Sequence, residues 1–179
     1  MNAEKIIPLK MIRENLRNIP QFALPENFSL RWFRSGDEKV WERIHVEADK
    51  LTKITPELFR QQFGDDDALL AARQGYLLDG RGNAIGTATA WFNDNFEGAR
   101  VGRVHWVAIV PEHQGKGLSK PLMTATCHRL NELGHARAYL STSSARIPAI
   151  KLYLEFGFVP LIRSAEDESI WKEVLAALP

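Results

Sequence analysis

A glycine-rich junction at residues 114–119 separates a stretch with strand character from a stretch with helix character, and this change limits the folds open to the chain. Before it, turn sequences separate three segments rich in β-branched and aromatic residues: GYLLD from residue 75, AIGTATAWF from residue 84 and RVGRVHWVAIV from residue 100. After it, apolar residues recur at helical spacing from Leu118 to Leu133, and Gly134 is a typical C-terminal stop. Three consecutive strands that lead into a helix predict an α/β domain with a mixed sheet.

The flanking segments continue the same alternation. FSLRWFR (28–34) predicts a strand, Ser35 can cap a following helix, and a second helix is expected from Pro56 to Phe63. Three later segments predict a strand, a helix and a strand in turn: ARAYLSTSS (136–144), PAIKLYLEF (148–156) and GFVPLIR (157–163). The final stretch, 168–179, is compatible with either a strand or a helix.

The resulting order is β-α-α-β-β-β-α-β-α-β, an α/β fold of the α+β type, with a mixed and mostly antiparallel sheet flanked by helices. Residues 1–27 mix Lys, Arg and Pro with only a short amphipathic piece. We interpret them as an N-terminal extension, and residues 28–179 as the domain itself. A single domain is expected for a chain of 179 residues.

Composition excludes several classes of function. The net charge of +1 gives no overall positive field for nucleic acid, and no run of about 18 apolar residues could span a membrane. The only cysteine, Cys127, excludes an internal disulfide, and residues 1–20 contain no signal-like apolar run, so a cytoplasmic location is expected. The acidic stretch 64–67 lacks partners at ligand spacing, so we interpret it as a solvated loop and helix-start signal and expect no metal.

The glycine-rich junction favours an anion. A strand that delivers Gly115 and Gly117 into a helix N-terminus exposes unpaired N–H groups, and Lys116 and Lys120 add positive charge nearby. The alternative is a tight turn with solvated lysines and no ligand. The P-loop pattern fails because Val110 occupies its first glycine position, and the dinucleotide pattern fails because its third glycine position falls on a lysine.

Two blocks of sequence resemble the GCN5-related N-acetyltransferase (GNAT) family. The first is Gln114-Gly115-Lys116-Gly117-Leu118-Ser119, which is similar to the family's Q/R-x-x-G-x-G/A signature and follows the strand-like VAIVPEH. It departs from that signature at its last residue, where serine replaces Gly or Ala. The second is PAIKLYLEFGFVP (148–160), which is similar to the family's A-x-x-L-Y-x-x-x-G-F segment. The resemblance covers roughly residues 28–170 and implies the family's GNAT-like mixed sheet.

The resemblance also implies acetyl-CoA as the cosubstrate. Its pantetheine arm is expected to pair like an added strand with the backbone of Val107, Ala108 and Ile109. Its pyrophosphate is expected to bind the N–H groups of the loop residues Gln114, Gly115, Lys116, Gly117, Leu118 and Ser119.

Transfer of an acetyl group to an amine requires a proton donor for the departing thiolate and a base for the amine. The resemblance assigns the first role to Tyr153, whose phenol, with a pKa of about 10, can act as an acid or simply hydrogen-bond the sulfur. His105 is the first candidate for the base. Glu47, Asp94, Glu97 and a chain of water molecules remain alternatives.

Arg146 stands where the family frequently has an asparagine. It is expected either to reach a coenzyme A phosphate or to be a solvated residue at the helix start. The expected function is an acetyl-CoA-dependent N-acetyltransferase that uses direct attack in a ternary complex. The acceptor is a small-molecule or peptide amine, and pairing of two copies as a homodimer stays open. A non-catalytic acyl-CoA sensor or interaction domain is the alternative, and another acyl chain or an oxygen acceptor is a third.

Overall fold

The computed structural model describes residues 6–178. Its strands are β1 (Pro8–Arg13), β2 (Ser29–Trp32), β3 (Gln74–Leu78), β4 (Ala84–Phe96), β5 (Ala99–Ile109), β6 (Ala138–Ser143) and β7 (Val159–Pro160). Its helices are α1 (Glu38–Ala48), α2 (Leu58–Phe63), α3 (Asp67–Ala71), α4 (Ser119–Glu132), α5 (Ile147–Glu155) and α6 (Ala165–Ala176), with a 3₁₀ turn, η1, at Pro111–His113. Within residues 6–178, no helix has the length and apolar character needed to cross a membrane.

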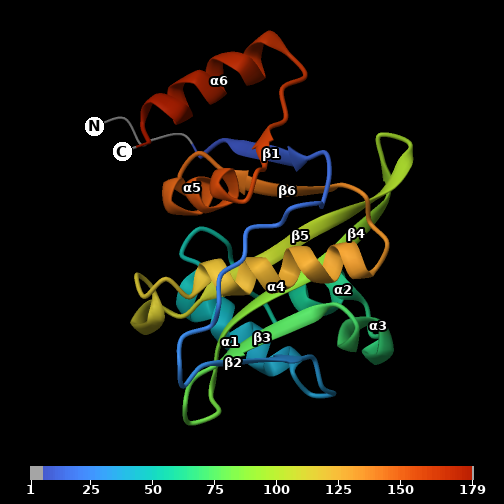
Figure 1. Ribbon diagram of the computed structural model, residues 1–179, viewed down its shortest axis with the longest axis vertical. Helices are drawn as coiled ribbons and strands as arrows, with labels where there is room; N and C mark the ends of the chain where they lie inside the picture. Colours follow the sequence, from blue (N-terminus) through green and yellow to red (C-terminus); the bar gives the residue numbers. More distant parts are fainter. Residues whose placement is uncertain (1–5, 179) are drawn as a thin grey trace.

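The strands form one open seven-stranded sheet in the order β2-β3-β4-β5-β6-β1-β7 (Figure 1). Neighbouring strands are antiparallel except β5 and β6, which run parallel. The α/β fold with a mixed, mostly antiparallel sheet is therefore confirmed. Every helix and strand expected between residues 28 and 160 is present, although several are shorter than the sequence pattern suggested.

The expectation that residues 1–27 lie outside the fold is corrected by β1. This strand pairs with β6 over Pro8–Arg13 and with β7 at Met11 and Ile12, so it lies inside the sheet. The side chain of Met11 is fully buried. These residues complete the half of the sheet that follows β5, because β7 has no other neighbour to pair with.

Capping side chains explain where two further helices begin. The Ser164 side chain accepts a hydrogen bond from the N–H of Asp167 at 3.0 Å, so the undecided C-terminal stretch is the helix α6. The Asp66 side chain accepts from the N–H of Leu69 at 2.9 Å and starts α3. The first helix, α1, begins after Asp37 rather than after Ser35.

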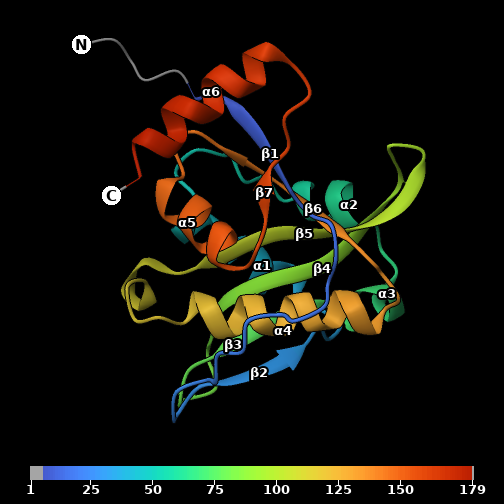
Figure 2. The same cartoon turned by 45° about the horizontal axis from the view of Figure 1, so that its top comes forward.

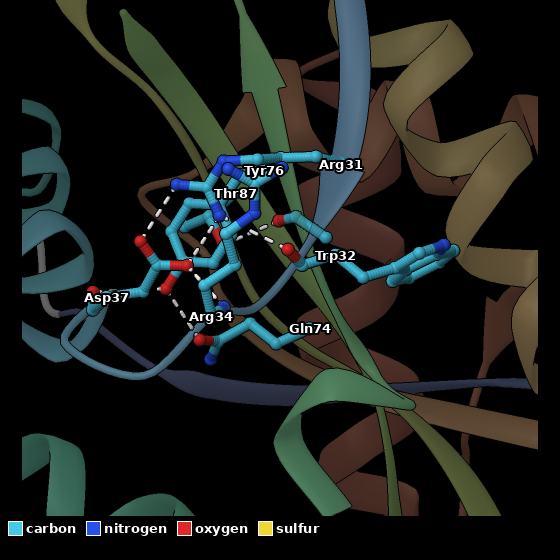
Figure 3. Close-up of polar contacts among 8 residues, drawn as sticks. Arg31, Trp32, Arg34, Asp37, Gln74, Tyr76 and Thr87 are labelled. Carbon is cyan, nitrogen blue, oxygen red and sulfur yellow. Dashed lines mark hydrogen bonds and ion pairs between the residues drawn. The ribbon is translucent and has the colours of Figure 1, made fainter. Parts of the chain in front are cut away.

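Asp37 anchors the start of α1 to the sheet through a buried polar network (Figure 3). Arg31, on β2, binds both carboxylate oxygens of Asp37, the second at 2.8 Å. The Tyr76 hydroxyl donates to the Gln74 side chain at 2.6 Å, and the Asp37 carbonyl lies 3.2 Å from the same hydroxyl. Burial raises the pKa of Tyr76, so this phenol stays protonated as a donor. The network fixes α1, and with it one side of the site described below.

The sheet divides between β5 and β6. These strands pair only where they meet, at Gly102 with Ala138 and at Arg103 with Tyr139. Beyond that point they separate toward the side where η1 and α5 lie, as both ribbon views show (Figure 1, Figure 2). Two main buried clusters pack against the sheet. One joins α1 and α2 to β3, β4 and β5, and the other joins α5 and α6 to β1 and β6 but also includes Ala90 of β4, Val104 of β5 and residues of α4.

Candidate active site

The loop after β5 presents a row of unused N–H groups at the start of α4. Within the described residues, the backbone N–H groups of residues 115–119 donate to no acceptor. Gly115 and Gly117 have φ values of 72° and 75°, a conformation that L side chains rarely adopt. The N-terminus of α4 has no capping side chain, because Leu118 occupies that position. Alternating left-handed glycines beside a helix start are a backbone geometry that suits an anion, and an anion site here stays a prediction of the sequence.

Gln114 is placed differently from the other loop residues. Its N–H donates to the Pro111 carbonyl at 3.1 Å, and its side-chain amide donates to the Ile109 carbonyl at 2.7 Å. Both groups therefore hold the loop against the end of β5. The N–H of Gln114, which the sequence predicted to bind the pyrophosphate, is thus used within the turn that begins at Pro111.

The edge of β5 that faces β6 is open beside this loop. Within the described residues, positions 104–109 of β5 have no partner on β6, and Val107, Ala108 and Ile109 lie in this stretch. Thr89 pairs with His105 but Thr87 pairs with Ala108, so β5 carries one extra residue. This bulge bends a strand and re-aims its edge. It leaves free edge positions that suit an extended ligand.

We call residues 114–119, which the sequence predicts to bind an anion, the anion loop, and the gap between β5 and β6 beyond Arg103 and Tyr139 the divide. Helix α5 extends from a contact with α4 beside the anion loop to a contact at the other end of the divide. At its C-terminal end, Glu155 accepts a hydrogen bond from Lys120 of α4 at 2.6 Å. At its N-terminal end, Arg146 donates to Asp49, just beyond α1, at 2.7 Å. Tyr153 lies between the two contacts. Nine residues of helix, about 13 Å, separate Arg146 from the end of α5 that meets Lys120.

Tyr153 is a protonated donor in a buried position. Its residue is 8% exposed and its ring packs against Phe158 with centroids 6.4 Å apart. Burial raises the pKa of Tyr153 to about 12, and the positive charge of Arg146 opposes that rise. The phenol is therefore neutral at physiological pH and offers an O–H group.

His105 lies on the α2 side of β5 with a defined tautomer. The Gln62 side-chain oxygen is 3.0 Å from His105 Nε2 and accepts the indole N–H of Trp106, also at 3.0 Å. Because indole only donates, that atom of Gln62 must be oxygen, and His105 must donate from Nε2. Nδ1 is then its basic atom. Burial, with further contributions from Arg103 and His45, lowers the pKa of His105 well below its ordinary value.

A cluster of aromatic rings that the sequence did not assign to a site surrounds Trp106. Trp41 and His45 of α1 stack with centroids 4.2 Å apart, and both meet the Trp106 ring at about right angles. His45 Nδ1 lies 3.0 Å from the Trp41 carbonyl and so carries the proton. Among the described residues, Trp41 Nε1 and His45 Nε2 are buried and have no hydrogen-bond partner. Burial lowers the pKa of His45 to about 4.

The three carboxylates named as alternative bases are occupied elsewhere. Glu47 pairs with Arg43 at 3.2 Å on the outer face of α1. Asp94 and Glu97 lie on the β4–β5 hairpin, at the end where β5 and β6 meet rather than where they separate. The structure does not bring them to Tyr153. In the described part of the chain, no group of three or more His, Cys, Asp or Glu side chains is placed to hold a metal ion.

The fold and the site together define a class: an α/β domain whose sheet opens between two strands beside a glycine-rich loop at a helix start, with a buried tyrosine on the helix α5. Comparison with known proteins agrees, since residues 28–158 match the model of the acetyltransferase (GNAT) family. The chain belongs to this family.

Two relatives named mycothiol acetyltransferase are similar to the chain. The one from Pseudarthrobacter chlorophenolicus is 32% identical over 152 residues, covering 79% of this chain and 45% of that protein. The one from Nocardioides sp. is 30% identical over 165 residues, covering 83% and 55%. The chain thus spans about half the length of the curated relatives it matches.

Solved structures share the fold at lower identity. A GCN5-related N-acetyltransferase from Sphaerobacter thermophilus superposes with a TM-score of 0.72 at 19% identity, covering 87% of this chain and 49% of that chain. The ribosomal-protein-S18-alanine N-acetyltransferase from Escherichia coli superposes with a TM-score of 0.61 at 18% identity, covering 75% and 79%. These likenesses concern the fold.

Proposed function

We propose that this chain is an acetyl-CoA-dependent N-acetyltransferase that moves an acetyl group to a primary amine by direct attack in a ternary complex. The observation that carries the proposal is the row of five unused N–H groups at residues 115–119, beside the open edge of β5. The loop fits a pyrophosphate, and the edge at residues 107–109 fits an extended arm that pairs like a strand. Acetyl-CoA supplies an activated thioester between these two parts.

The amine nitrogen forms a bond to the thioester carbon while the carbon–sulfur bond breaks. The Tyr153 hydroxyl donates a hydrogen bond to the departing sulfur. An alkyl thiol has a pKa of about 8.5, so complete proton transfer from a phenol of pKa about 12 is uphill. The high pKa therefore supports a stabilising hydrogen bond more than full protonation by Tyr153.

His105 is proposed as the group that receives the proton from the amine. Its hydrogen bond to Gln62 leaves Nδ1 as the accepting atom. An aliphatic amine is mostly protonated at neutral pH, by analogy with a lysine pKa of about 10.4, so a proton must leave before attack. The lowered pKa of His105 keeps the ring neutral but makes it a weak base. Water that carries the proton onward fits this arrangement.

Calorimetric titration with acetyl-CoA tests the first part of the proposal. Binding at micromolar concentrations is expected, and no heat of binding up to millimolar concentrations would refute it. A panel of primary amines, scored for release of free coenzyme A thiol, tests transfer. The names of the curated relatives support starting with small-molecule amines. Peptides with free N-termini form the second part of the panel.

A sensor that binds acyl-CoA without turnover is the second candidate. Substitution of Tyr153 distinguishes it from an enzyme. In an enzyme, Tyr153→Phe removes the hydrogen bond to the sulfur but leaves the anion loop intact. Transfer then falls while binding survives. A sensor binds acetyl-CoA equally well in both forms and releases no thiol with any amine.

A further inference from the structure

Arg146 and Asp49 form a contact between the two halves of the divided sheet. The guanidinium of Arg146 donates to Asp49 Oδ2 at 2.7 Å and to Thr52 Oγ1 at 3.3 Å. Asp49 Oδ1 accepts the N–H groups of Leu51 at 2.9 Å and Thr52 at 3.2 Å. One carboxylate thus organises the segment 49–52 and binds it to the N-terminus of α5.

The position of this contact matters because β5 and β6 separate here. Asp49 follows α1, whose buried residues belong to the cluster on β3, β4 and β5. Arg146 precedes α5, whose buried residues belong to the cluster on β1 and β6. Within the described residues, no strand pairing joins the halves beyond Arg103 and Tyr139. The ion pair spans them at the end of the site away from the anion loop.

The carboxylate of Asp49 is shielded, so the contact is stronger than a surface ion pair. Its side chain is 8% exposed, against 35% for Arg146. Burial would raise the pKa of Asp49, but hydrogen bonds from Leu51, Arg146 and Thr52 outweigh burial and lower it. The carboxylate is therefore charged at neutral pH, and leaving it unpaired is unfavourable.

Arg146 also shares a face of its helix with Tyr153. Seven residues separate them, which is two turns of helix and about 10 Å along its axis. Whatever fixes the start of α5 therefore fixes the phenol relative to the segment 49–52. The loop at residues 114–119 lies toward the other end of α5, where Glu155 binds Lys120, so the end at Arg146 is left for the acceptor.

Resting on the proposed function, we propose that Arg146 is a positioning residue for the acceptor, and that Asp49 holds it. The ion pair sets the width of the divide at the acceptor end and aligns the amine with the thioester. It takes no part in gripping the coenzyme. This role explains an arginine at a place where an asparagine is frequent in the family.

The test compares Arg146→Gln, Asp49→Asn and the double variant with the wild-type chain. The KM for the amine is expected to rise about 10-fold in each single variant, since each loses one hydrogen bond to a charged group; tenfold corresponds to about 1.4 kcal/mol. The Kd for coenzyme A is expected to stay within about twofold. The double variant is expected to be no worse than the singles, because all three remove one contact. Arg146→Lys, which keeps the charge, should restore part of the loss.

Arg163→Gln is the matched control. Arg163 forms an ion pair with Glu97 on the hairpin, outside the divide, and should leave the amine KM unchanged. Hydrogen exchange at the Leu51 and Thr52 amides gives a readout that needs no turnover, and it should accelerate in Arg146→Gln but not in Arg163→Gln. Unchanged exchange at these amides, an unchanged amine KM, or an equal loss of coenzyme A affinity would overturn the inference. A wild-type chain that binds no coenzyme A would instead overturn the proposed function, while the exchange measurement still tests the ion pair.

Discussion

Replacement of Gly117 by alanine is expected to weaken coenzyme A binding by about 5- to 30-fold. Gly117 has φ of +75°, and a Cβ built there has no heavy atom within 4 Å, so alanine does not collide with the protein. The effect comes from the backbone alone, because the left-handed conformation costs an L residue about 1–2 kcal/mol. When the loop leaves this conformation to relieve the strain, its N–H groups lose their common direction. At about 1.4 kcal/mol per factor of ten, the strain converts to the expected loss of affinity.

Gly98 provides a matched control for this substitution. It lies in the β4–β5 hairpin with φ of +78° and also has open space around a built Cβ. Gly98→Ala should therefore lower the free energy of unfolding by a similar amount and leave coenzyme A binding unchanged. Calorimetry gives the Kd, and urea denaturation gives the stability of both variants.

Equal affinity in Gly117→Ala and the wild-type chain would refute the reasoning, as would an equal loss of affinity in Gly98→Ala. Lys116→Ala separates backbone from charge. Lys116 is an exposed residue of the loop, so its removal should weaken binding by about fivefold or less, because exposed charges contribute about 0.2–1 kcal/mol. If Lys116→Ala raised the Kd for coenzyme A more than Gly117→Ala, the affinity would depend mainly on charge rather than on the backbone.

Three further variants test the Tyr153 hydroxyl, the buried His45 and the strand β1. Tyr153→Phe should lower kcat about 10- to 100-fold through loss of a hydrogen bond to a charged sulfur, with the coenzyme A Kd nearly unchanged; equal kcat in a thiol-release assay would contradict this. The pKa of His45 is about 4 in the folded chain and about 6.5 unfolded, so the unfolded chain binds more protons below pH 6.5 and stability falls with pH there. Between pH 7 and 5 this histidine should account for about 2 kcal/mol, which denaturation of His45→Gln should not show; the same loss in both chains would disprove it. Met11→Ala should lower the free energy of unfolding by about 2–5 kcal/mol, because β1 is part of the core; a change below about 0.5 kcal/mol would return residues 1–27 to an extension.

Local signals in the sequence were sufficient for most elements between residues 28 and 160. The helix α4 and its stop at Gly134 followed from apolar spacing and one glycine with φ of +81°. The C-terminal helix α6 was left undecided, although the spacing of Ser164 and Asp167 is a capping signal that could have decided it. The first strand, β1, carried no such signal. Its pairing partners lie more than a hundred residues away, so periodicity within 1–27 could not reveal it.

The residues of the candidate site show the same difference between local and long-range causes. The glycine turn after β5 could be predicted because its positive φ values depend on two glycines of the chain itself. The roles of Gln62, Trp106 and Asp49 were missed because each depends on a partner from a distant element, and their hydrogen bonds have no pattern in sequence. His105 was found by its residue type, but the atom available for chemistry was decided by Gln62.

What the sequence determined by itself are the features whose cause is local: the order of helices and strands, the glycine turn, and the two blocks that the family shares. The tertiary structure alone decided which charges meet. By local arguments alone, Arg146 could have faced solvent or a phosphate. It binds Asp49 because the fold places the start of α5 close to the end of α1, across the gap between β5 and β6. Pairing between distant side chains depends on the path of the whole chain, and that path is fixed by burial of the core rather than by the residues that meet.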